Sequence, residues 1–309
     1  MILSLELLPS GRWKKERILS CLYALSNHPE EHYRPFYIPK KRGGYRRLDV
    51  PDPLLKQVQR NILHHVLEGF SISPAASAYK KGRSAAAAAA LHQGKRLMLK
   101  LDIQDFFGSI TVPMVLGQGF PAVYFPDEVR GLLTALCCFR ERLPQGAPTS
   151  PALSNLVMKP FDEAMLDWCG QQNISYTRYC DDMTFSGDFN PAAVTGKVRG
   201  FLEAMGMELN QAKTTVCSQA VRQTVTGITV NEICQLPRDY RRRLRQEVHL
   251  CLRYGTGTED RTASIRHLEQ LMGKVSYLLQ VRPEDVWFAQ RKEELAEYLK
   301  KERGNQDEL

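Results

Sequence analysis

Two adjacent aspartates between two short strand-like segments constrain this sequence more than any other feature. Residues 176–179 read Tyr-Thr-Arg-Tyr and residues 183–186 read Met-Thr-Phe-Ser, a composition rich in the β-branched and aromatic residues that are typical of strands. Only Cys180, Asp181 and Asp182 separate the two segments, so the chain has to reverse its direction there. The pattern predicts a tight antiparallel hairpin with the two aspartates at its tip.

A second predicted strand, residues 97–103, carries another aspartate. Its apolar residues recur at every second position and share one face: Leu97, Leu99, Leu101 and Ile103. Asp102 therefore leaves the strand on the other face, away from that core, together with Met98 and Lys100.

A strand aspartate beside a paired aspartate at a hairpin tip is suited to nucleotidyl transfer. That reaction uses two magnesium ions about 4 Å apart, one on the attacking hydroxyl and one on the leaving pyrophosphate. Magnesium prefers carboxylate oxygens and keeps several waters, so two or three aspartates on rigid backbone are enough. Paired aspartates in turns are also common as plain solvated residues, and the spacing alone leaves both interpretations open.

Charge and composition narrow the class of partner. The 309 residues contain 42 Lys and Arg against 34 Asp and Glu, a formal net charge of +8 with a pI of about 9.0. A basic excess favours polyanionic partners, because cations placed on phosphates release condensed counterions, although a merely soluble basic protein has the same balance.

The cysteines and the hydropathy indicate a reducing, aqueous environment. None of the 8 cysteines forms a Cys-x-x-Cys pair, so a structural zinc site is not expected, and the adjacent Cys137 and Cys138 are predicted to be core thiols. The N-terminus is charged too early for a signal peptide, and no apolar run approaches the roughly twenty residues of a membrane span. We expect a cytoplasmic protein with no membrane partner.

The flanking segments are predicted to be mainly helical. Apolar spacing predicts helices over residues 13–26 and 54–67, and Gly43-Gly44 between basic residues predicts a hairpin turn. Ser84 can cap a helix through the alanine run 85–90. Beyond Pro237, an arginine-rich helical stretch, an amphipathic helix over 265–279 and a charged helix over 283–301 are expected.

Four motifs, in order, resemble the conserved boxes of reverse transcriptases. Residues 179–182 match the Tyr-x-Asp-Asp box, and residues 101–107 (Leu-Asp-Ile-Gln-Asp-Phe-Phe) resemble the first catalytic strand. Residues 143–151 resemble the box between them, and residues 206–214 match Gly-x-x-Leu-Asn-x-x-Lys-Thr. The resemblance covers residues 36–231 and is highly specific, since four ordered matches are not plausibly chance.

This resemblance implies an α+β right-hand polymerase fold with fingers, an antiparallel-sheet palm and a helical thumb. The implied domains are residues 1–95 for the N-terminal helices and fingers, 96–235 for the palm, with part of 110–145 returning to the fingers, and 236–309 for a basic thumb.

The resemblance also implies the catalytic residues of an RNA-directed DNA polymerase. Asp102 and Asp181 would be the principal ligands of two Mg²⁺ ions, with Asp182 beside them and the backbone carbonyl of Ile103 completing the set. Lys213 corresponds to the lysine proposed to protonate the leaving pyrophosphate.

The incoming dNTP has implied contacts of its own. The backbone amides of Asp105 and Phe106 would face the triphosphate, Phe107 would exclude a 2'-hydroxyl by its volume, and Gln145 would contact the sugar.

Fixed positive charge from the fingers would clamp the triphosphate. Arg46, with Lys40 or Lys41, matches those fingers positions. Arg47 is an open alternative, if the alignment shifts by one residue.

The chain resembles the bacterial retron branch in particular. Residues 225–227 (Val-Thr-Gly) match a retron signature, and Ala89 and His92 fit the retron Asn-Ala-x-x-His box, whose asparagine position holds Ala88. Gly108 stands where retrons usually carry proline in Asp-Phe-Phe-Pro-Ser. These two departures weaken the retron assignment slightly and leave the polymerase assignment untouched.

Retron membership would imply dedicated partners. Such enzymes bind their own noncoding RNA (msr-msd), prime from the 2'-hydroxyl of a guanosine in it, make a branched RNA–DNA product and act in phage defence with a separately encoded effector protein. RNA-binding residues would be His92 and the basic cluster Arg241, Arg242, Arg243 and Arg245, which suits the backbone of A-form RNA.

Two alternatives remain at this point. One is another small bacterial reverse transcriptase, of the group II intron, diversity-generating or abortive-infection type. The other is a noncatalytic RNA-binding scaffold on a polymerase fold, which would have no need for three close carboxylates that repel one another.

Overall fold

The computed structural model describes residues 1–8, 14–40 and 43–304. The chain divides into two compact units. One consists of Met1–Arg83, Leu99–Phe185 and Phe189–Val216, and the other of Ser84–Met98, Ser186–Asp188 and the chain from Cys217 onward. This division into two units differs from the predicted division into fingers, palm and thumb. The three-part division stays a prediction.

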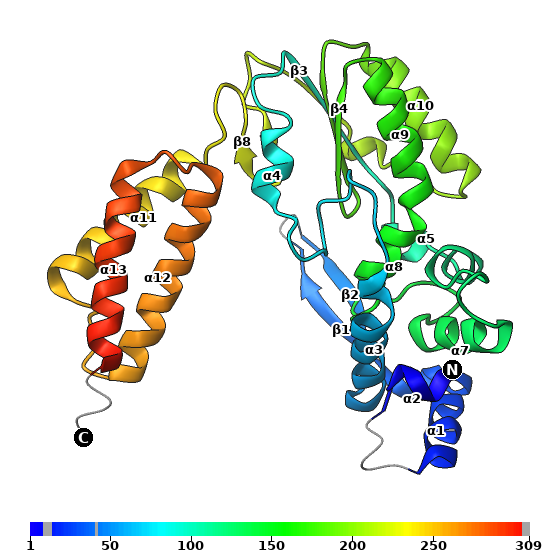
Figure 1. Ribbon diagram of the computed structural model, residues 1–309. Helices are drawn as coiled ribbons and strands as arrows, with labels where there is room; N and C mark the ends of the chain where they lie inside the picture. Colours follow the sequence, from blue (N-terminus) through cyan, green and yellow to red (C-terminus); the bar gives the residue numbers. More distant parts are fainter. Residues whose placement is uncertain (9–13, 41–42, 305–309) are drawn as a thin grey trace. The chain divides into compact units, whose positions relative to one another are not determined.

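The first unit begins with short helices and a long β-hairpin. The helices are η1 (Ile2–Leu5), α1 (Lys15–Asn27), α2 (Pro29–His32), α3 (Pro53–His65) and η2 (Leu67–Gly69). Strands β1 (Tyr33–Pro39) and β2 (Tyr45–Pro51) pair antiparallel, from Tyr33 opposite Pro51 to Pro39 opposite Tyr45 (Figure 1). Gly43 and Gly44 both have positive φ, at 89° and 76°, which confirms the predicted turn.

The central sheet has the strand order β4-β5-β3-β6. Its strands are β3 (Leu97–Asp102), β4 (Ser175–Tyr179), β5 (Asp182–Gly187) and β6 (Thr215–Ser218). The hairpin predicted around the paired aspartates is therefore β4–β5, and the predicted strand 97–103 is β3, which lies beside β5. This adjacency brings the end of β3 next to the tip of the hairpin.

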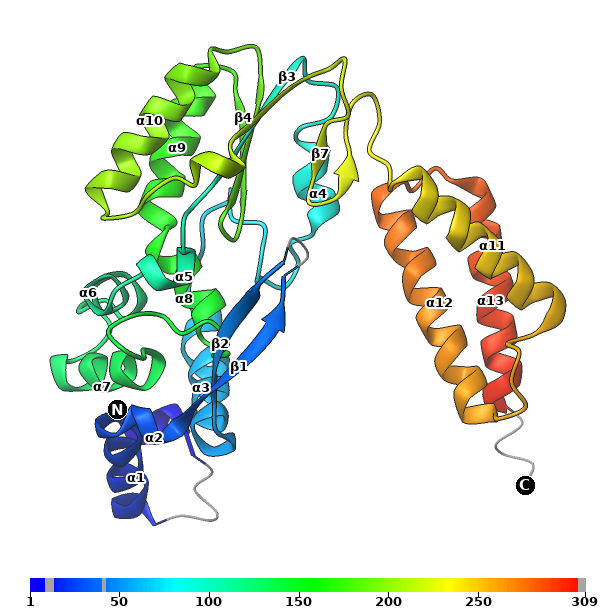
Figure 2. The ribbon, with the colours of Figure 1, turned by 180° about the vertical axis from the view of Figure 1, so that it is seen from behind.

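Helices cover one side of the sheet in the first unit. Helices α8 (Ser150–Val157), α9 (Lys159–Gln171) and α10 (Pro191–Ala204) follow one another, and α9 and α10 lie side by side in both views (Figures 1 and 2). Helix α9 contacts β4, and the rings of Tyr176 and Phe185 stack with centroids 4.8 Å apart.

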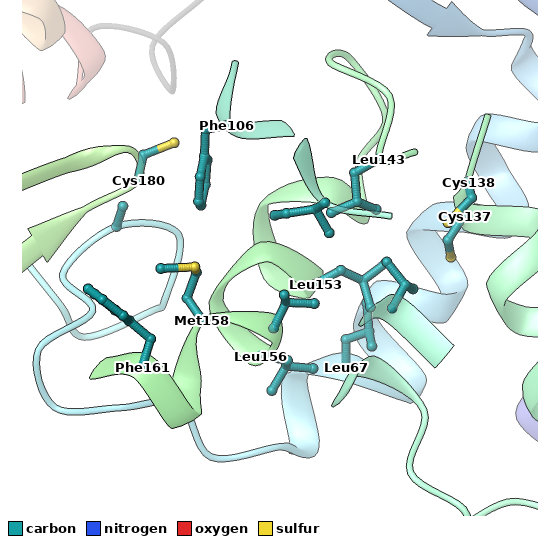
Figure 3. Packing of buried hydrophobic residues seen from close by; sticks show 14 of the residues in the cluster. Leu67, Phe106, Cys137, Cys138, Leu143, Leu153, Leu156, Met158, Phe161 and Cys180 are labelled. Atoms are coloured by element: carbon teal, nitrogen blue, oxygen red, sulfur yellow. The ribbon is translucent and has the colours of Figure 1, made fainter. Parts of the chain in front are cut away.

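Further helices complete the first unit. They are α5 (Phe106–Ser109), α6 (Val112–Met114), η3 (Val115–Gly119), α7 (Asp127–Cys137) and η4 (Gln211–Lys213). Phe106, Met158 and Cys180 belong to the main hydrophobic cluster, which runs on through Leu153 and Leu156 (Figure 3).

Two adjacent cysteines lie in the core of the first unit. Cys137 and Cys138 are buried in the same cluster, as predicted, and all eight cysteines are free thiols. Burial raises the pKa of Cys137 to about 12, so this thiol stays protonated and serves as a small apolar side chain.

The second unit joins the alanine run to the C-terminal helices. It contains α4 (Ala85–Ala90), the short hairpin β7 (Thr224–Val225) and β8 (Ile228–Thr229), and the helices α11 (Arg238–Tyr254), α12 (Arg261–Val281) and α13 (Val286–Gly304). Ser84 caps α4, since its Oγ accepts from the amide of Ala87 at 3.1 Å, and this confirms the predicted cap. The three predicted C-terminal helices are confirmed.

Residues of β3 belong to both units. Leu99 and Leu101 lie in the core of the first unit, whereas Met98, on the face of Asp102, is buried with Ala86 and Ala89 in the second.

Among the described residues, none of the helices combines the length and the apolar composition that a membrane span requires.

Candidate active site

Three aspartates meet at the end of β3. One carboxylate oxygen from each of Asp102, Asp181 and Asp182 lies within 4.8 Å of the others. Asp102 is the last residue of β3, and Asp182 is the first residue of β5. The backbone amide of Ile103 donates to the carbonyl of Asp181 at 3.2 Å, which ties the end of β3 directly to the hairpin tip.

A third segment fixes the other side of Asp102. The amide of Asn210 donates to the carbonyl of Asp102 at 2.8 Å, and the amide of Gln104 donates to the carbonyl of Glu208 at 2.8 Å. Ile103 also forms an antiparallel bridge with Leu209. The backbone of Asp102 is therefore held from both sides, as a metal ligand on rigid backbone requires.

The two aspartates at the hairpin tip have raised pKa values. Burial, followed by the negative charges of Asp181 and Asp102, raises the pKa of Asp182 to about 6. The pKa of Asp181 is also raised, chiefly by burial and further by Asp102. Groups held this close in a partly buried site need compensating positive charge to be ionised together.

Part of that positive charge comes from Lys213. Its Nζ lies 2.7 Å from Oδ2 of Asp102, and this hydrogen bond is the largest cause that raises the pKa of the lysine. The other oxygen of Asp102, Oδ1, is buried and has no hydrogen-bond partner. An unpaired buried carboxylate oxygen beside two further carboxylates fits a hard divalent cation.

The triad opens into a cavity of about 790 Å³. Six of the seven residues predicted to bind the nucleotide line it: Lys40, Arg46, Asp105, Phe106, Phe107 and Gln145. Lys213 lines it as well, whereas Lys41 lies outside the described residues. The structure thus brings the catalytic and nucleotide-binding candidates into one space.

Asp105 has an unusual backbone that explains Gly108. Asp105 begins α5 in the left-handed region, with φ 43°, and a Cβ at position 108 would lie 2.2 Å from its Oδ2. Any side chain at 108, proline included, would force Asp105 into another rotamer. The departure from the usual retron proline is therefore linked to the side-chain position of Asp105.

Phe106 and Phe107 take different environments. Phe106 is buried at 4% exposure under the cavity, and Phe107 is half-buried, with ring centroids 5.4 Å apart. Because only the ring of Phe107 remains partly open, it is the one that can meet a nucleotide sugar.

The two arginines of β2 differ in their partners. Nε and Nη2 of Arg47 donate to Oδ1 of Asp49 at 3.0 and 2.8 Å. Within the part of the chain that the structure describes, none of the ion pairs includes Arg46. Both residues line the cavity, on opposite faces of the hairpin.

The segment around Gln145 is pressed against β2. The amide of Asp49 donates to the carbonyl of Gln145 at 2.9 Å. Gly146 has φ 136°, and a Cβ there would lie 2.8 Å from the carbonyl oxygen of Asp49. The glycine of this motif therefore permits a close backbone approach, which places Gln145 in the cavity.

Sequence reasoning missed Tyr79. This residue lines the cavity with φ 62°, and its hydroxyl donates to Sγ of Cys180 at 3.3 Å. The signal available was weak, because a lone tyrosine in a loop a hundred residues before the hairpin does not indicate contact with it.

Comparison with known proteins agrees with this geometry. Residues 38–230 match the family model of the reverse transcriptase (RNA-dependent DNA polymerase). The chain is 38% identical to the Retron Mx65 reverse transcriptase of Myxococcus xanthus over 80% of its own length and 61% of that protein. It is 33% identical to the Retron Ec83 reverse transcriptase of Escherichia coli over 81% of this chain and 84% of that one. The chain belongs to the retron reverse transcriptases.

Membership in the retron reverse transcriptases decides against the other small bacterial types considered above. The match still spans less than two thirds of the Mx65 relative. Among solved structures, the chain is similar to the telomerase of Candida albicans in complex with a fragment of telomeric RNA. The TM-score is 0.50 and the sequence identity is 12%, and the match covers 87% of this chain and 63% of the telomerase chain. This likeness supports the right-hand polymerase fold.

The retron-type Val-Thr-Gly motif forms the β7–β8 turn. Thr226 and Gly227 have φ of 48° and 86°, and Val225 pairs with Ile228. Two consecutive positive φ values are those of a tight hairpin turn, which explains the glycine.

The expected RNA-binding residues lie in the second unit and differ in accessibility. His92 is fully buried, and its Nδ1 lies 2.7 Å from Oγ of Ser186, so the ring has a structural role here and is not presented to RNA. His92 follows α4 by two residues, and α4 packs on the β7–β8 hairpin.

The four arginines of α11 are solvent-accessible. Arg242, Arg243 and Arg245 are exposed and Arg241 is half-buried, while the guanidinium of Arg245 also lies 4.9 Å from the ring centroid of Trp287. Their RNA contacts stay a prediction.

Proposed function

We propose that this chain is the RNA-directed DNA polymerase of a retron and copies part of its own noncoding RNA into DNA. The observation that carries the proposal is the triad of Asp102, Asp181 and Asp182 at the wall of a cavity that basic and aromatic residues line. The retron relatives, named as reverse transcriptases, support the same activity.

The metal site would hold two Mg²⁺ ions. Asp102, Asp181, Asp182 and the backbone carbonyl of Ile103 would be the protein ligands, and the partnerless Oδ1 of Asp102 fits this assignment. When bound, the ions would activate the 3'-hydroxyl or priming hydroxyl and neutralise the charge that develops on the leaving pyrophosphate.

The cavity residues would bind and select the dNTP. Arg46, with Lys40 or Lys41, would clamp the triphosphate from the β1–β2 hairpin, and we favour Arg46 over Arg47 because Asp49 already pairs with Arg47. The amides of Asp105 and Phe106 would face the phosphates.

The sugar would meet two further residues. Gln145 would contact it, and the partly open ring of Phe107 would exclude a 2'-hydroxyl.

Lys213 would supply a proton to the leaving group. Its hydrogen bond to Asp102 keeps the ammonium protonated and inside the cavity, so the proton is available at Nζ when the pyrophosphate leaves.

The proposed partners are those of other retron reverse transcriptases. We propose that the chain binds its msr-msd RNA through a thumb, residues 236–309, that exposes the arginines of α11, and that it primes from a guanosine 2'-hydroxyl. It would release a branched RNA–DNA product and act with a separately encoded effector protein in antiphage defence.

Primer extension tests the enzymatic proposal against a noncatalytic scaffold. Purified chain, an RNA template with a DNA primer, dNTPs and Mg²⁺ are expected to give DNA product, and Asp181→Ala and Asp182→Ala are expected to abolish it. Asp167→Ala, at an exposed position of α9, is the matched control and should extend normally. Equal extension by all four proteins would refute the metal assignment.

The retron part of the proposal has its own test. The chain is expressed with its adjacent noncoding DNA, and the nucleic acid that co-purifies is sequenced. The expected species is DNA joined to an internal guanosine of an RNA, and unbranched DNA alone would contradict the priming proposal.

A further inference from the structure

A buried ion pair lies directly behind the catalytic hairpin. The side chains of Arg178, on β4, and Asp162, on α9, are both 0% exposed. Nη2 of Arg178 donates to Oδ2 of Asp162 at 2.6 Å, and Nε donates to Oδ1 at 2.8 Å. Buried pairs of this kind add little net stability, since well-packed apolar residues often serve as well, so the pair calls for another explanation.

The guanidinium uses its remaining donors on two further elements. Nη1 donates to the carbonyl of Cys180 at 3.0 Å, and Nη2 donates to Oδ1 of Asn155, on α8, at 3.2 Å. Burial alone would lower the pKa of Arg178, but the charge of Asp162 raises the pKa above its usual value, so the donors stay charged. One side chain thus links two helices to the tip of the hairpin.

Cys180 is the residue that needs such support. Its φ of 60° is in the left-handed region, which costs a residue with a Cβ about 1–2 kcal/mol. Two side chains hold it there: Arg178 binds its carbonyl, and the hydroxyl of Tyr79 binds its thiol. Burial raises the pKa of Cys180 to about 11, so that thiol remains neutral.

Holding the carbonyl of Cys180 orients the next residue. The peptide unit is planar, so the oxygen of Cys180 and the nitrogen and Cα of Asp181 lie in one plane. A fixed oxygen therefore fixes the direction in which Asp181 leaves the turn.

We propose that Arg178 is a positioning residue for polymerisation, which holds the Cys180–Asp181 peptide so that the Asp181 carboxylate faces Asp102 across the metal site. This inference rests on the proposed function. Asp162 neutralises the charge of the Arg178 guanidinium, which holds this peptide. Only a planar fork can serve Asp162, Asn155 and the Cys180 carbonyl at once, and a lysine ammonium cannot.

The chain offers a matched control for a merely structural role. The hydroxyl of Tyr176 donates to Oδ1 of Asp162 at 2.8 Å and belongs to the same buried network, but Cys180 is not among its partners. Tyr176→Phe therefore perturbs the network without touching the contact to the hairpin tip.

The experiment compares Arg178→Lys with Tyr176→Phe in primer extension. We expect Arg178→Lys to lower kcat at least tenfold, to change the KM for dNTP less than threefold, and to raise the Mg²⁺ concentration for half-maximal rate severalfold. Tyr176→Phe is expected to lower the melting temperature and to keep kcat and the Mg²⁺ requirement within twofold. A folded Arg178→Lys protein with wild-type kcat and Mg²⁺ dependence would overturn the inference.

A second variant covers the case in which Arg178→Lys does not fold. Arg178→Met with Asp162→Asn removes both charges together, leaves no unpaired buried charge, and keeps an acceptor for Tyr176. It should show the same loss of kcat, and full activity would again refute the role of Arg178. If the wild-type chain does not extend a primer, the proposed function fails, and this is seen before any variant is compared.

Discussion

The ammonium of Lys213 lies 2.7 Å from Oδ2 of Asp102, although the two residues come from opposite ends of the palm motifs. The contact gives the most buried carboxylate of the triad a positive neighbour before any metal binds. We propose that it also places a proton donor where pyrophosphate would leave.

Removal of Lys213 tests that second role. Lys213→Ala is expected to lower kcat on the order of 100-fold, the size of a typical general-acid contribution. Lys213→Arg keeps a positive charge near Asp102 but holds its proton too tightly to donate it, so most of the loss should remain. Single-turnover incorporation at saturating dNTP and Mg²⁺ measures both, and a kcat within twofold of wild type for Lys213→Arg would exclude proton donation by this residue.

Substitutions of the two arginines of β2 should differ in their effect on dNTP binding. Arg46→Ala is expected to raise the KM for dNTP at least tenfold, because it removes from the cavity a cation that has no ion-pair partner among the described residues. Arg47→Ala should raise it less than threefold, since the charge of Arg47 is already offset by Asp49. Steady-state extension over a range of dNTP concentrations distinguishes them, and the reverse order would assign the clamp to Arg47.

Phe107 should control the choice of sugar. Phe107→Ala opens space beside the nucleotide, and we expect kcat/KM for rNTP to rise tenfold or more relative to that for dNTP, about 1–3 kcal/mol of discrimination. The same variant's dNTP extension serves as the internal control. An unchanged rNTP to dNTP ratio in an active variant would show that another residue excludes the 2'-hydroxyl.

The pKa of Asp182 predicts how metal-free stability depends on pH. Because its pKa is raised to about 6 in the folded protein, this carboxyl destabilises the fold once it ionises. Its favourable contribution is present below its ordinary pKa of about 4 and is lost as the pH rises through about 6.

In the presence of a chelator, the melting temperature of the wild-type protein should therefore fall as the pH rises from about 4 to about 6. The melting temperature of Asp182→Asn should fall less over the same range. Added Mg²⁺ should recover the loss in wild type only. Parallel curves of melting temperature against pH for the two proteins would contradict the raised pKa of Asp182.

Gly146 allows a stability test with a built-in control. Gly146→Ala would place a Cβ 2.8 Å from the Asp49 carbonyl at φ 136°, and we expect a loss of about 1–3 kcal/mol. Gly200→Ala, in α10 with open space around it, should instead stabilise by up to about 1 kcal/mol. Chemical denaturation measures both, and equal effects would contradict the close approach.

The sequence was sufficient for the elements that carry the triad. Period-two alternation marks β3, turn residues mark β1–β2, and the strand composition on both sides of Asp181 marks the catalytic hairpin. These signals are local, so they are readable without knowing the fold.

Contacts between distant segments were not readable. The partners of Arg178, Tyr79 and His92 lie on other elements, and no local pattern specifies them. His92 shows the limit most clearly, because a histidine after an alanine helix looks accessible until β5 is placed against it.

The alanine helix α4 packs with α12 in a single core, although residues 91–260 lie between them in the sequence. During synthesis on the ribosome, α4 therefore emerges long before the segment that completes its core exists. Contacts between such distant segments carry a large loop-closure cost and form late. We expect the nascent chain to hold an unfinished apolar surface until α12 leaves the exit tunnel, so that pausing before α12 is made exposes this surface to chaperones.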